Sequence, residues 1–168
     1  GIVNGPVRAI VVGIPNVGKS TFINAFAGKA CTKTGNKPGV TKGKQWIRLN
    51  KNLELLDTPG ILWPKFEDNQ VGMHLAFIGS MNDEIIIMEE LACDLLERLQ
   101  ELYPDAITQR YAISRQEDNA GTLAEIARSR RCLLKGEALD LKKASDLLLD
   151  DFRSGRLGRM TLERPLGQ

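Results

Sequence analysis

The sequence predicts two consecutive regions, an α/β region and then an all-α region. Residues 7–12 form a continuous apolar run of the kind found in buried strands, and a helical pattern follows the glycine-containing stretch 13–20. Beyond about residue 80, apolar side chains recur at helical spacing. We therefore predict an α/β domain at residues 1–75 and a helical domain at residues 76–168.

The first predicted elements are a strand at residues 7–12 and a helix at residues 20–26, joined by the sequence GIPNVGKS. This GxxxxGKS pattern is a phosphate-binding loop, because the turn and the helix start direct backbone N–H groups at one point. An unpaired lysine beside a glycine turn brings no packing benefit, so we assign Lys19 to phosphate. The predicted nucleotide contacts are Pro15, Asn16, Val17, Gly18, Lys19, Ser20 and Thr21.

The next segment predicts a loop and then a pair of strands. Residues 28–44 are rich in Gly, Lys and Thr and show no periodicity, which is typical of a loop. Residues 45–49 and 53–56 read as two short strands joined by Asn50-Lys51-Asn52 in a hairpin-like connection.

The helical domain shows three further helix patterns. Met88, Leu91, Leu95, Leu99 and Leu102 recur at helical spacing before Pro104. Thr122-Leu-Ala-Glu125 has the form of a capping box, which predicts a helix from there to about Arg131. A last helix is predicted from Asp140 to about Ser154, with Gly155 as its end.

Composition limits the class of protein. With 42% hydrophobic and 26% charged residues the chain is an ordinary globular protein, and no apolar run approaches the roughly 20 residues that span a bilayer. The three cysteines show no paired spacing, so neither a disulfide framework nor a zinc site is indicated. We expect a cytoplasmic protein that does not contact membranes.

Charge divides the chain into blocks. Residues 1–80 carry 10 Lys/Arg and 4 Asp/Glu, residues 81–127 carry 3 and 11, and residues 128–168 carry 10 and 6. Basic side chains crowd the loop at 28–44, as expected beside phosphates or RNA, although a solvated loop explains the clustering about equally well.

Two further segments complete a triphosphate site. Asp57-Thr-Pro-Gly60 follows the second strand of the pair, where the carboxylate can hold magnesium and the Gly60 N–H can meet a γ-phosphate. Thr41, in the basic loop, can close over the magnesium ion and the γ-phosphate. We therefore predict a magnesium site at Ser20, Thr41 and Asp57, and action on the γ-phosphate by Lys19, Thr41 and Gly60.

At this point a family resemblance is clear. GIPNVGKS, the PGVT of residues 38–41 and the long block LLDTPGILWPKFED resemble the circularly permuted, Ras-like P-loop GTPases of the ribosome biogenesis GTPase A, or YlqF, family. The similarity continues through VGMHLAFIGSMNDE to GRLGRMTLERP and so covers nearly the whole chain. It implies GTP and GDP as ligands, magnesium as cofactor, and a partial GTPase domain followed by an all-α domain.

The resemblance also implies a cellular role. Members of the family are expected to bind a precursor of the large ribosomal subunit, with its rRNA and ribosomal proteins, in the GTP state and to leave after hydrolysis. The helical domain resembles a small RNA-binding module that docks on this subunit. We expect a monomeric assembly factor.

One motif of guanine-specific GTPases is absent. Asn-Lys occurs only at Asn36-Lys37 and Asn50-Lys51, and neither is followed by x-Asp, the motif whose Asp pairs with the base. In the permuted family the base-recognition strands precede the phosphate loop, so we expect this chain to be the C-terminal part of a longer protein. By itself it should have an exposed sheet edge, bind guanine nucleotides weakly, discriminate poorly against ATP and have little or no activity.

Two positions bear on the mechanism that the resemblance implies. Ile61 stands where Ras-like GTPases place the glutamine that orients water, so another group must supply that function; the family's histidine lies upstream of residue 1. Asn16 matches the asparagine that holds a potassium ion in GTPases of similar sequence, which predicts potassium-stimulated turnover.

Other candidates have structural interpretations. His74, the only histidine, lies on an amphipathic stretch with Val71 and Ile78, which favours a structural role. For Trp46 and Trp63 we favour core or hinge packing over base stacking. An alternative function remains: an rRNA-binding module that performs no nucleotide turnover in this truncated form.

Overall fold

The computed structural model describes residues 5–35, 38–62 and 66–164, which form two compact units. We call the first the phosphate-loop unit; it comprises Gly1–Asn69 and Gly79–Asn82. The second, the helical unit, comprises Gln70–Ile78 and Asp83–Gln168. The chain therefore passes between the units three times, because residues 79–82 group with the first unit while both flanking segments group with the second.

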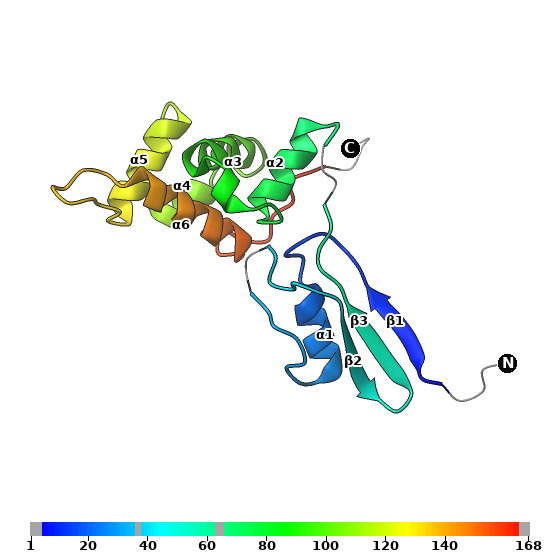
Figure 1. The fold of residues 1–168 in the computed structure, drawn as a ribbon. Helices are drawn as coiled ribbons and strands as arrows, with labels where there is room; N and C mark the ends of the chain where they lie inside the picture. Colours follow the sequence, from blue (N-terminus) through cyan, green and yellow to red (C-terminus); the bar gives the residue numbers. More distant parts are fainter. Residues whose placement is uncertain (1–4, 36–37, 63–65, 165–168) are drawn as a thin grey trace. The chain divides into compact units, whose positions relative to one another are not determined.

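The phosphate-loop unit contains a three-stranded mixed sheet and one helix (Figure 1). Strand β3 (Leu53–Asp57) lies between β1 (Val7–Val11), to which it is parallel, and β2 (Gln45–Asn50), to which it is antiparallel. The predicted strands and their hairpin are confirmed. Within the described residues β1 pairs only with β3, so its other edge is open, as predicted.

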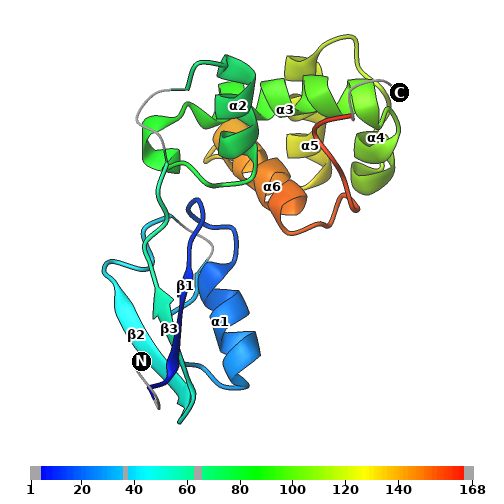
Figure 2. The ribbon, with the colours of Figure 1, turned by 90° about the vertical axis from the view of Figure 1, so that its right-hand side faces the viewer.

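Helix α1 (Lys19–Ala27) covers one face of this sheet (Figure 2). Its fully buried Ile23 packs with Ile47 of β2 and Leu55 of β3. Strand alternation places a second apolar row on the opposite face, where Ile10, Leu56 and Trp46 are register partners. Ile10 is 58% exposed and Trp46 is 52% exposed, so that face is not covered by the described part of this unit.

Of the predicted core or hinge packing of Trp46, core packing is therefore wrong for the described residues. The Arg8 guanidinium lies over the Trp46 ring, 5.3 Å from its centroid, and also pairs with Glu54. The Arg8 cation therefore partly covers the exposed indole. Trp63, the second tryptophan of that prediction, lies outside the described residues.

The helical unit is built from five α-helices and a short 3₁₀ helix within the described part of the chain. Their bounds are α2 (Asn69–Phe77), η1 (Asp83–Ile85), α3 (Met88–Leu102), α4 (Ala106–Tyr111), α5 (Asn119–Ser129) and α6 (Leu141–Arg153). Helix α3 contacts α4, α5 and α6, and α5 also contacts α6. Leu95, Leu96 and Leu99 of α3 are fully buried, as are Ile126 of α5 and Leu148 of α6.

The predicted helices at residues 88–102 and 140–154 are confirmed, but the predicted capping box is wrong. Asp118 is the N-cap of α5 and its carboxylate accepts a hydrogen bond from the Gly121 N–H at 2.6 Å. Thr122 lies inside the helix, and its hydroxyl donates to the Asp118 carbonyl. Helix α4 was not predicted, since six residues are too few to show a clear helical period.

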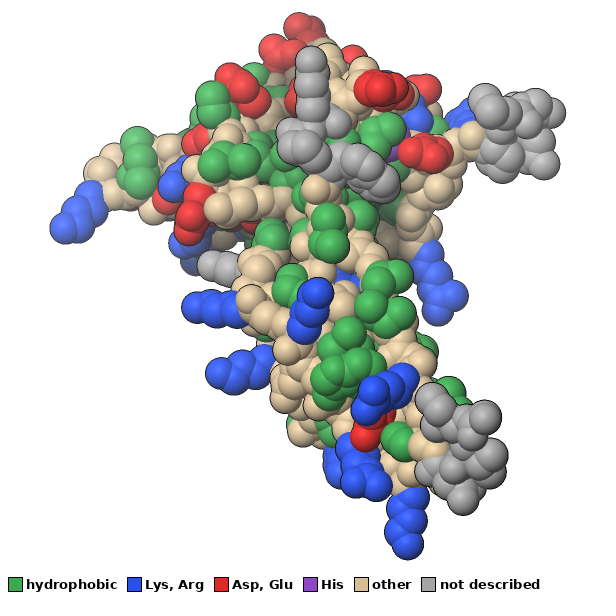
Figure 3. Space-filling view, turned by 45° about the vertical axis from the view of Figure 1, so that its right-hand side comes forward, with side chains coloured by type: hydrophobic (Ala, Val, Ile, Leu, Met, Phe, Trp, Pro, Cys, Tyr) green, Lys and Arg blue, Asp and Glu red, His purple; other side chains and the backbone are tan. Residues whose placement is uncertain are grey.

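None of the helices in the described ranges has the length and apolar character that crossing a membrane requires. Charge is distributed unevenly over the surface that Figure 3 draws. Lys and Arg side chains stand out from the phosphate-loop unit, whereas Asp and Glu side chains gather on the helical unit.

Candidate functional site: a phosphate-binding cavity

The GIPNVGKS segment forms the tight connection between β1 and α1 that its sequence predicts. Gly18 caps α1 with a left-handed φ of 91°, and Asn16 is also left-handed, with φ 57°. A glycine adopts this conformation without strain, and asparagine tolerates it better than most residues. The loop and the start of α1 line one cavity, an arrangement suited to phosphate.

Lys19 closes over the loop. Its ammonium group donates hydrogen bonds to the carbonyl oxygens of Gly13 at 3.0 Å and Ile14 at 2.6 Å. Burial lowers the pKa of Lys19, and the nearby Asp57 carboxylate opposes that change. A lysine held this way is a cation placed beside the loop, where it can meet phosphate oxygens.

The three residues predicted to hold magnesium lie together. The Ser20 hydroxyl lies 3.1 Å from the Thr41 hydroxyl and donates to Asp57 Oδ2 at 3.1 Å. Asp57 is 1% exposed, and its other oxygen, Oδ1, is buried without a hydrogen-bond partner among the described residues.

A buried carboxylate oxygen without a partner is costly, so it indicates a missing cation or a donor such as water. Two hydroxyls and a carboxylate are hard oxygen donors, which suits magnesium bound with phosphate and water. The donor set therefore fits the predicted ion. Within the described part of the chain no cluster of three His, Cys, Asp or Glu side chains offers an all-protein metal site.

The DTPG segment is packed against the phosphate loop. The Thr58 hydroxyl donates to the Val11 carbonyl at 2.7 Å, which fixes the end of β3 beside the end of β1. A Cβ on Gly60 would lie 2.4 Å from the Cα of Pro15, so only glycine fits there. The Ile61 N–H donates to the Gly13 carbonyl at 3.4 Å.

These segments enclose a cavity of about 270 Å³. Most of the predicted site residues line it: Pro15, Asn16, Gly18, Lys19, Ser20, Thr21, Thr41 and Gly60. Val17 and Asp57 do not. Val17 is 49% exposed, and Asp57 reaches the site through Ser20. No carboxylate side chain lies among the described residues that line this cavity.

Ile61, the residue after DTPG, is 75% exposed. It contributes to a separate apolar cavity with Val12, Ile14 and Leu62. A hydrocarbon side chain offers water no hydrogen bond, so Ile61 cannot orient an attacking water molecule.

Sequence reasoning did not single out the residues that hold the loop after α1. The Asn24 side chain accepts hydrogen bonds from the N–H groups of Cys31 and Thr32 and donates to the Thr32 carbonyl. The Thr32 hydroxyl in turn donates to the Ser20 carbonyl at 3.2 Å. This network leads the chain to Lys33, Thr34 and Gly35, which line the phosphate cavity.

Comparison with known proteins agrees with this geometry. Residues 8–127 match the family described as 50S ribosome-binding GTPase. The chain is 47% identical over 160 residues to ribosome biogenesis GTPase A of Bacillus cereus, covering 95% of this chain and 54% of that protein. It is 34% identical over 158 residues to the protein of the same name from Thermotoga maritima, covering 94% and 56%.

Solved structures are also similar. GNP-bound YlqF from T. maritima superposes with a TM-score of 0.63 and 31% identity, covering 95% of this chain and 60% of that one. A GDP-bound structure of YlqF gives a TM-score of 0.63 at 29% identity. This chain spans little more than half the length of these relatives.

The loop, the sheet order and the matches define a P-loop GTPase fold. More particularly, the chain belongs to the 50S ribosome-binding GTPase family. The predicted resemblance to ribosome biogenesis GTPase A and the predicted fold class are both confirmed.

Proposed function

We propose that this chain is the phosphate-binding and helical part of a GTP-hydrolysing assembly factor for the large ribosomal subunit. The observation that carries the proposal is the Ser20–Thr41–Asp57 cluster beside the phosphate cavity, with one buried Asp57 oxygen left without a partner. The names of the relatives support the ribosomal role. The complete factor would be monomeric and cytoplasmic.

Each part of the site has a role in this proposal. The loop N–H groups of residues 15–21 and the Lys19 ammonium group bind the phosphates of GTP or GDP. Ser20, Thr41 and Asp57 hold magnesium, which would neutralise phosphate charge. The Gly60 N–H contacts the γ-phosphate, so release of that phosphate frees the segment that follows.

Potassium is the second cation of the proposal. The side-chain oxygen of Asn16 would hold this ion, which would supply positive charge to the phosphate site. Because Ile61 cannot orient water, turnover should be slow without such assistance. An arginine finger, which acts in a similar way, accelerates hydrolysis roughly 10³- to 10⁵-fold.

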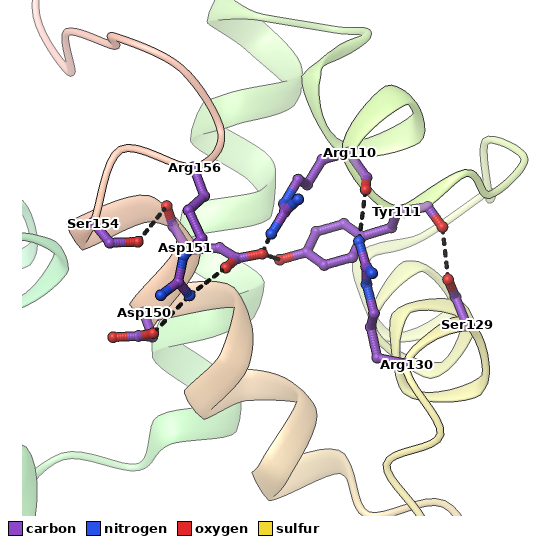
Figure 4. Close-up of polar contacts among 8 residues, drawn as sticks. All are labelled: Arg110, Tyr111, Ser129, Arg130, Asp150, Asp151, Ser154 and Arg156. Atoms are coloured by element: carbon purple, nitrogen blue, oxygen red, sulfur yellow. Dashed lines mark hydrogen bonds and ion pairs between the residues drawn. The ribbon is translucent and has the colours of Figure 1, made fainter.

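In this proposal the helical unit docks on RNA. Its arginines are not all equally available, because several pair within the unit (Figure 4). Arg110 and Arg156 both contact the buried Asp151, which also accepts a hydrogen bond from the Tyr111 hydroxyl. Seven basic side chains of this unit form no hydrogen bond or ion pair with the described residues: Arg115, Arg131, Lys135, Lys142, Lys143, Arg159 and Arg164.

One groove of this unit is lined both by arginines that pair with Asp151 and by an arginine that forms no such pair. It has a volume of about 630 Å³, and its polar lining residues include Arg110, Arg156 and Arg159 with Tyr103 and Gln109, and one carboxylate, Asp105. Asp151 holds two of these guanidinium groups in place, while Arg159 is exposed. Such a groove suits the phosphate backbone of a large-subunit precursor, and binding there should weaken steeply as salt rises.

A second candidate is an rRNA-binding module that does not turn over nucleotide in this truncated form. The absence of a base-reading carboxylate among the described cavity residues favours it for the chain by itself. The two functions differ in whether there is a GTP turnover for loss of the phosphate-loop lysine to abolish.

The test uses the full-length protein with Lys19→Ala, and with Lys51→Ala in an exposed turn as the matched control. In potassium buffer Lys19→Ala should reduce GTP turnover by at least about 10³-fold and leave RNA binding in the absence of nucleotide unchanged. Lys51→Ala should behave as wild type. Turnover that persists in Lys19→Ala would contradict the hydrolytic part of the proposal. Equal wild-type turnover rates in potassium and sodium buffers would contradict the potassium part.

A further inference from the structure

The four residues between α2 and η1 contact the phosphate loop. Gly79–Asn82 group with the phosphate-loop unit, although the chain on either side belongs to the helical unit. The Ser80 hydroxyl donates to the Pro15 carbonyl at 2.8 Å, and the Gly79 carbonyl accepts from the Asn16 side-chain nitrogen at 3.2 Å. These partners are 63 and 65 residues apart in sequence, so neither contact follows from a local motif.

Ser80 is placed as a fixed support rather than as a surface residue. It is 1% exposed, and its hydroxyl donates a hydrogen bond to the Pro15 carbonyl of the loop. Removal of the hydroxyl would take this donor away from the carbonyl. Pro15 is constrained from a second segment as well, because Gly60 packs against its Cα. The first half of the phosphate loop is therefore held by both the DTPG segment and the Gly79–Asn82 segment.

The contact with Gly79 sets the orientation of the Asn16 amide. A backbone carbonyl can only accept, so the amide nitrogen must face Gly79 and the amide oxygen must face the other way. Asn16 lines the phosphate cavity in a left-handed conformation that costs free energy for a residue other than glycine. The hydrogen bond to Gly79 thus stabilises both an unusual backbone and one of two amide orientations.

The Gly79–Asn82 segment is itself held at both ends. Arg153 donates to the carbonyls of Ala76 and Phe77 at 2.8 and 2.9 Å, and to the Asp83 carboxylate at 2.8 and 2.9 Å. One guanidinium group therefore joins the residues that precede the segment to the residue that follows it. Gly79 has a φ of 73°, which allows the chain to turn directly after α2.

We propose that Gly79 and Ser80 are positioning residues of the phosphate loop. They hold the Pro15 carbonyl and fix the orientation of the Asn16 side chain at the phosphate cavity, where the nucleotide would bind. This inference rests on the proposed function of the cavity. It adds that the GxPNVGKS sequence is insufficient without a carbonyl and a hydroxyl from the segment after α2.

The test compares Ser80→Ala with the exposed Ser114→Ala in the full-length protein. The affinity for a fluorescent non-hydrolysable GTP analogue with magnesium is measured in potassium and in sodium buffer, together with GTP turnover as a function of potassium. Ser80→Ala should weaken analogue binding roughly ten-fold and raise the potassium concentration for half-maximal turnover, because a buried acceptor loses its donor. Ser114→Ala should match wild type in both measurements.

A milder variant distinguishes loss of the hydrogen bond from a defect in folding. Ser80→Cys keeps the side-chain size but offers only a weak donor, so its affinity should lie between those of wild type and Ser80→Ala. A lower Tm for Ser80→Ala with unchanged affinity and unchanged potassium dependence would overturn the positioning role and leave a packing role. If wild type itself failed to bind the analogue, the proposed function would be contradicted and this inference with it.

Discussion

The two units of this chain achieve stability in different ways. The phosphate-loop unit has three fully or nearly buried apolar side chains among its described residues, Ile23, Ile47 and Leu55, on one face of its sheet. The helical unit has sixteen in its described part, contributed by every α-helix and by the connection after α5. Because burial of apolar surface is the main stabilising contribution, the helical unit has the more complete core.

The difference extends to the use of polar groups. In the helical unit the buried Asp151 has three partners, and the side chains of Asp118 and Asp140 cap helices α5 and α6. In the phosphate-loop unit a buried Asp57 oxygen lacks a partner, and strand β1 has an open edge in the described sheet. The helical unit therefore satisfies its buried carboxylate internally, whereas the described phosphate-loop unit leaves a carboxylate oxygen and a strand edge unpaired.

The largest expected effect on stability comes from truncating a buried apolar side chain in the core of either unit. Leu95→Ala, at a fully buried position of α3, should destabilise the helical unit by about 3 kcal/mol, and Ile23→Ala should destabilise the phosphate-loop unit by a similar amount. Calorimetry should resolve two unfolding transitions, each lowered by only one of the substitutions.

The exposed Ile87→Ala is the matched control for these variants, since its side chain is 59% exposed. It should leave both transitions in place. One cooperative transition lowered equally by Leu95→Ala and Ile23→Ala would show that the two units do not unfold independently.

A smaller effect is expected at Asp151. Burial opposes ionisation of this carboxyl, yet hydrogen bonds from Arg110, Arg156 and Tyr111 together lower its pKa. A lowered pKa contributes stability above the ordinary range of Asp that is lost as pH falls below about 4. The helical transition should therefore fall in temperature on acidification, and Asp151→Asn should lower it at neutral pH and reduce its pH dependence.

Asp150→Asn gives the comparison for this prediction, because Asp150 also pairs with Arg156 but is exposed. Surface ion pairs contribute little, so this variant should change stability by less than about 1 kcal/mol. Equal losses in both variants would contradict the special role of the buried carboxylate.

The smallest effect distinguishes the observed helix cap from the predicted one. Asp118→Ala removes the acceptor for the Gly121 N–H and should destabilise the helical unit by about 1 kcal/mol. Glu125→Ala would matter equally if the Thr122–Glu125 capping box existed. Thermal unfolding of the two variants decides, and a larger loss for Glu125→Ala would contradict the cap at Asp118.

Local patterns explain how much of this fold could be predicted. Helices α3 and α6 were predictable because each carries an apolar stripe between clear end signals, and the strands because of their short apolar runs. The cap of α5 was missed because the Thr-x-x-Glu pattern lies four residues after Asp118, inside the same helix. The six residues of α4 carry no such stripe.

The candidate site also has residues that the sequence could predict and residues that it could not. The loop lysine and the Ser20, Thr41 and Asp57 cluster could be predicted, since each lies in a motif whose chemistry requires that residue type. Asn24 and Ser80 could not, because they act through hydrogen bonds to backbone groups brought near by the fold. Nothing in their immediate sequence distinguishes them from other polar residues.

The central claim is that this chain carries the phosphate half of a guanine nucleotide site without the half that reads the base. The most direct test is calorimetric titration of the 168-residue chain with GDP and with ADP, in magnesium and potassium, beside the same titrations of the full-length protein. We predict affinities for GDP and ADP within about three-fold of each other for the chain, and a preference for GDP of at least about 100-fold for the full-length protein. A preference for GDP of ten-fold or more by the chain would contradict the claim.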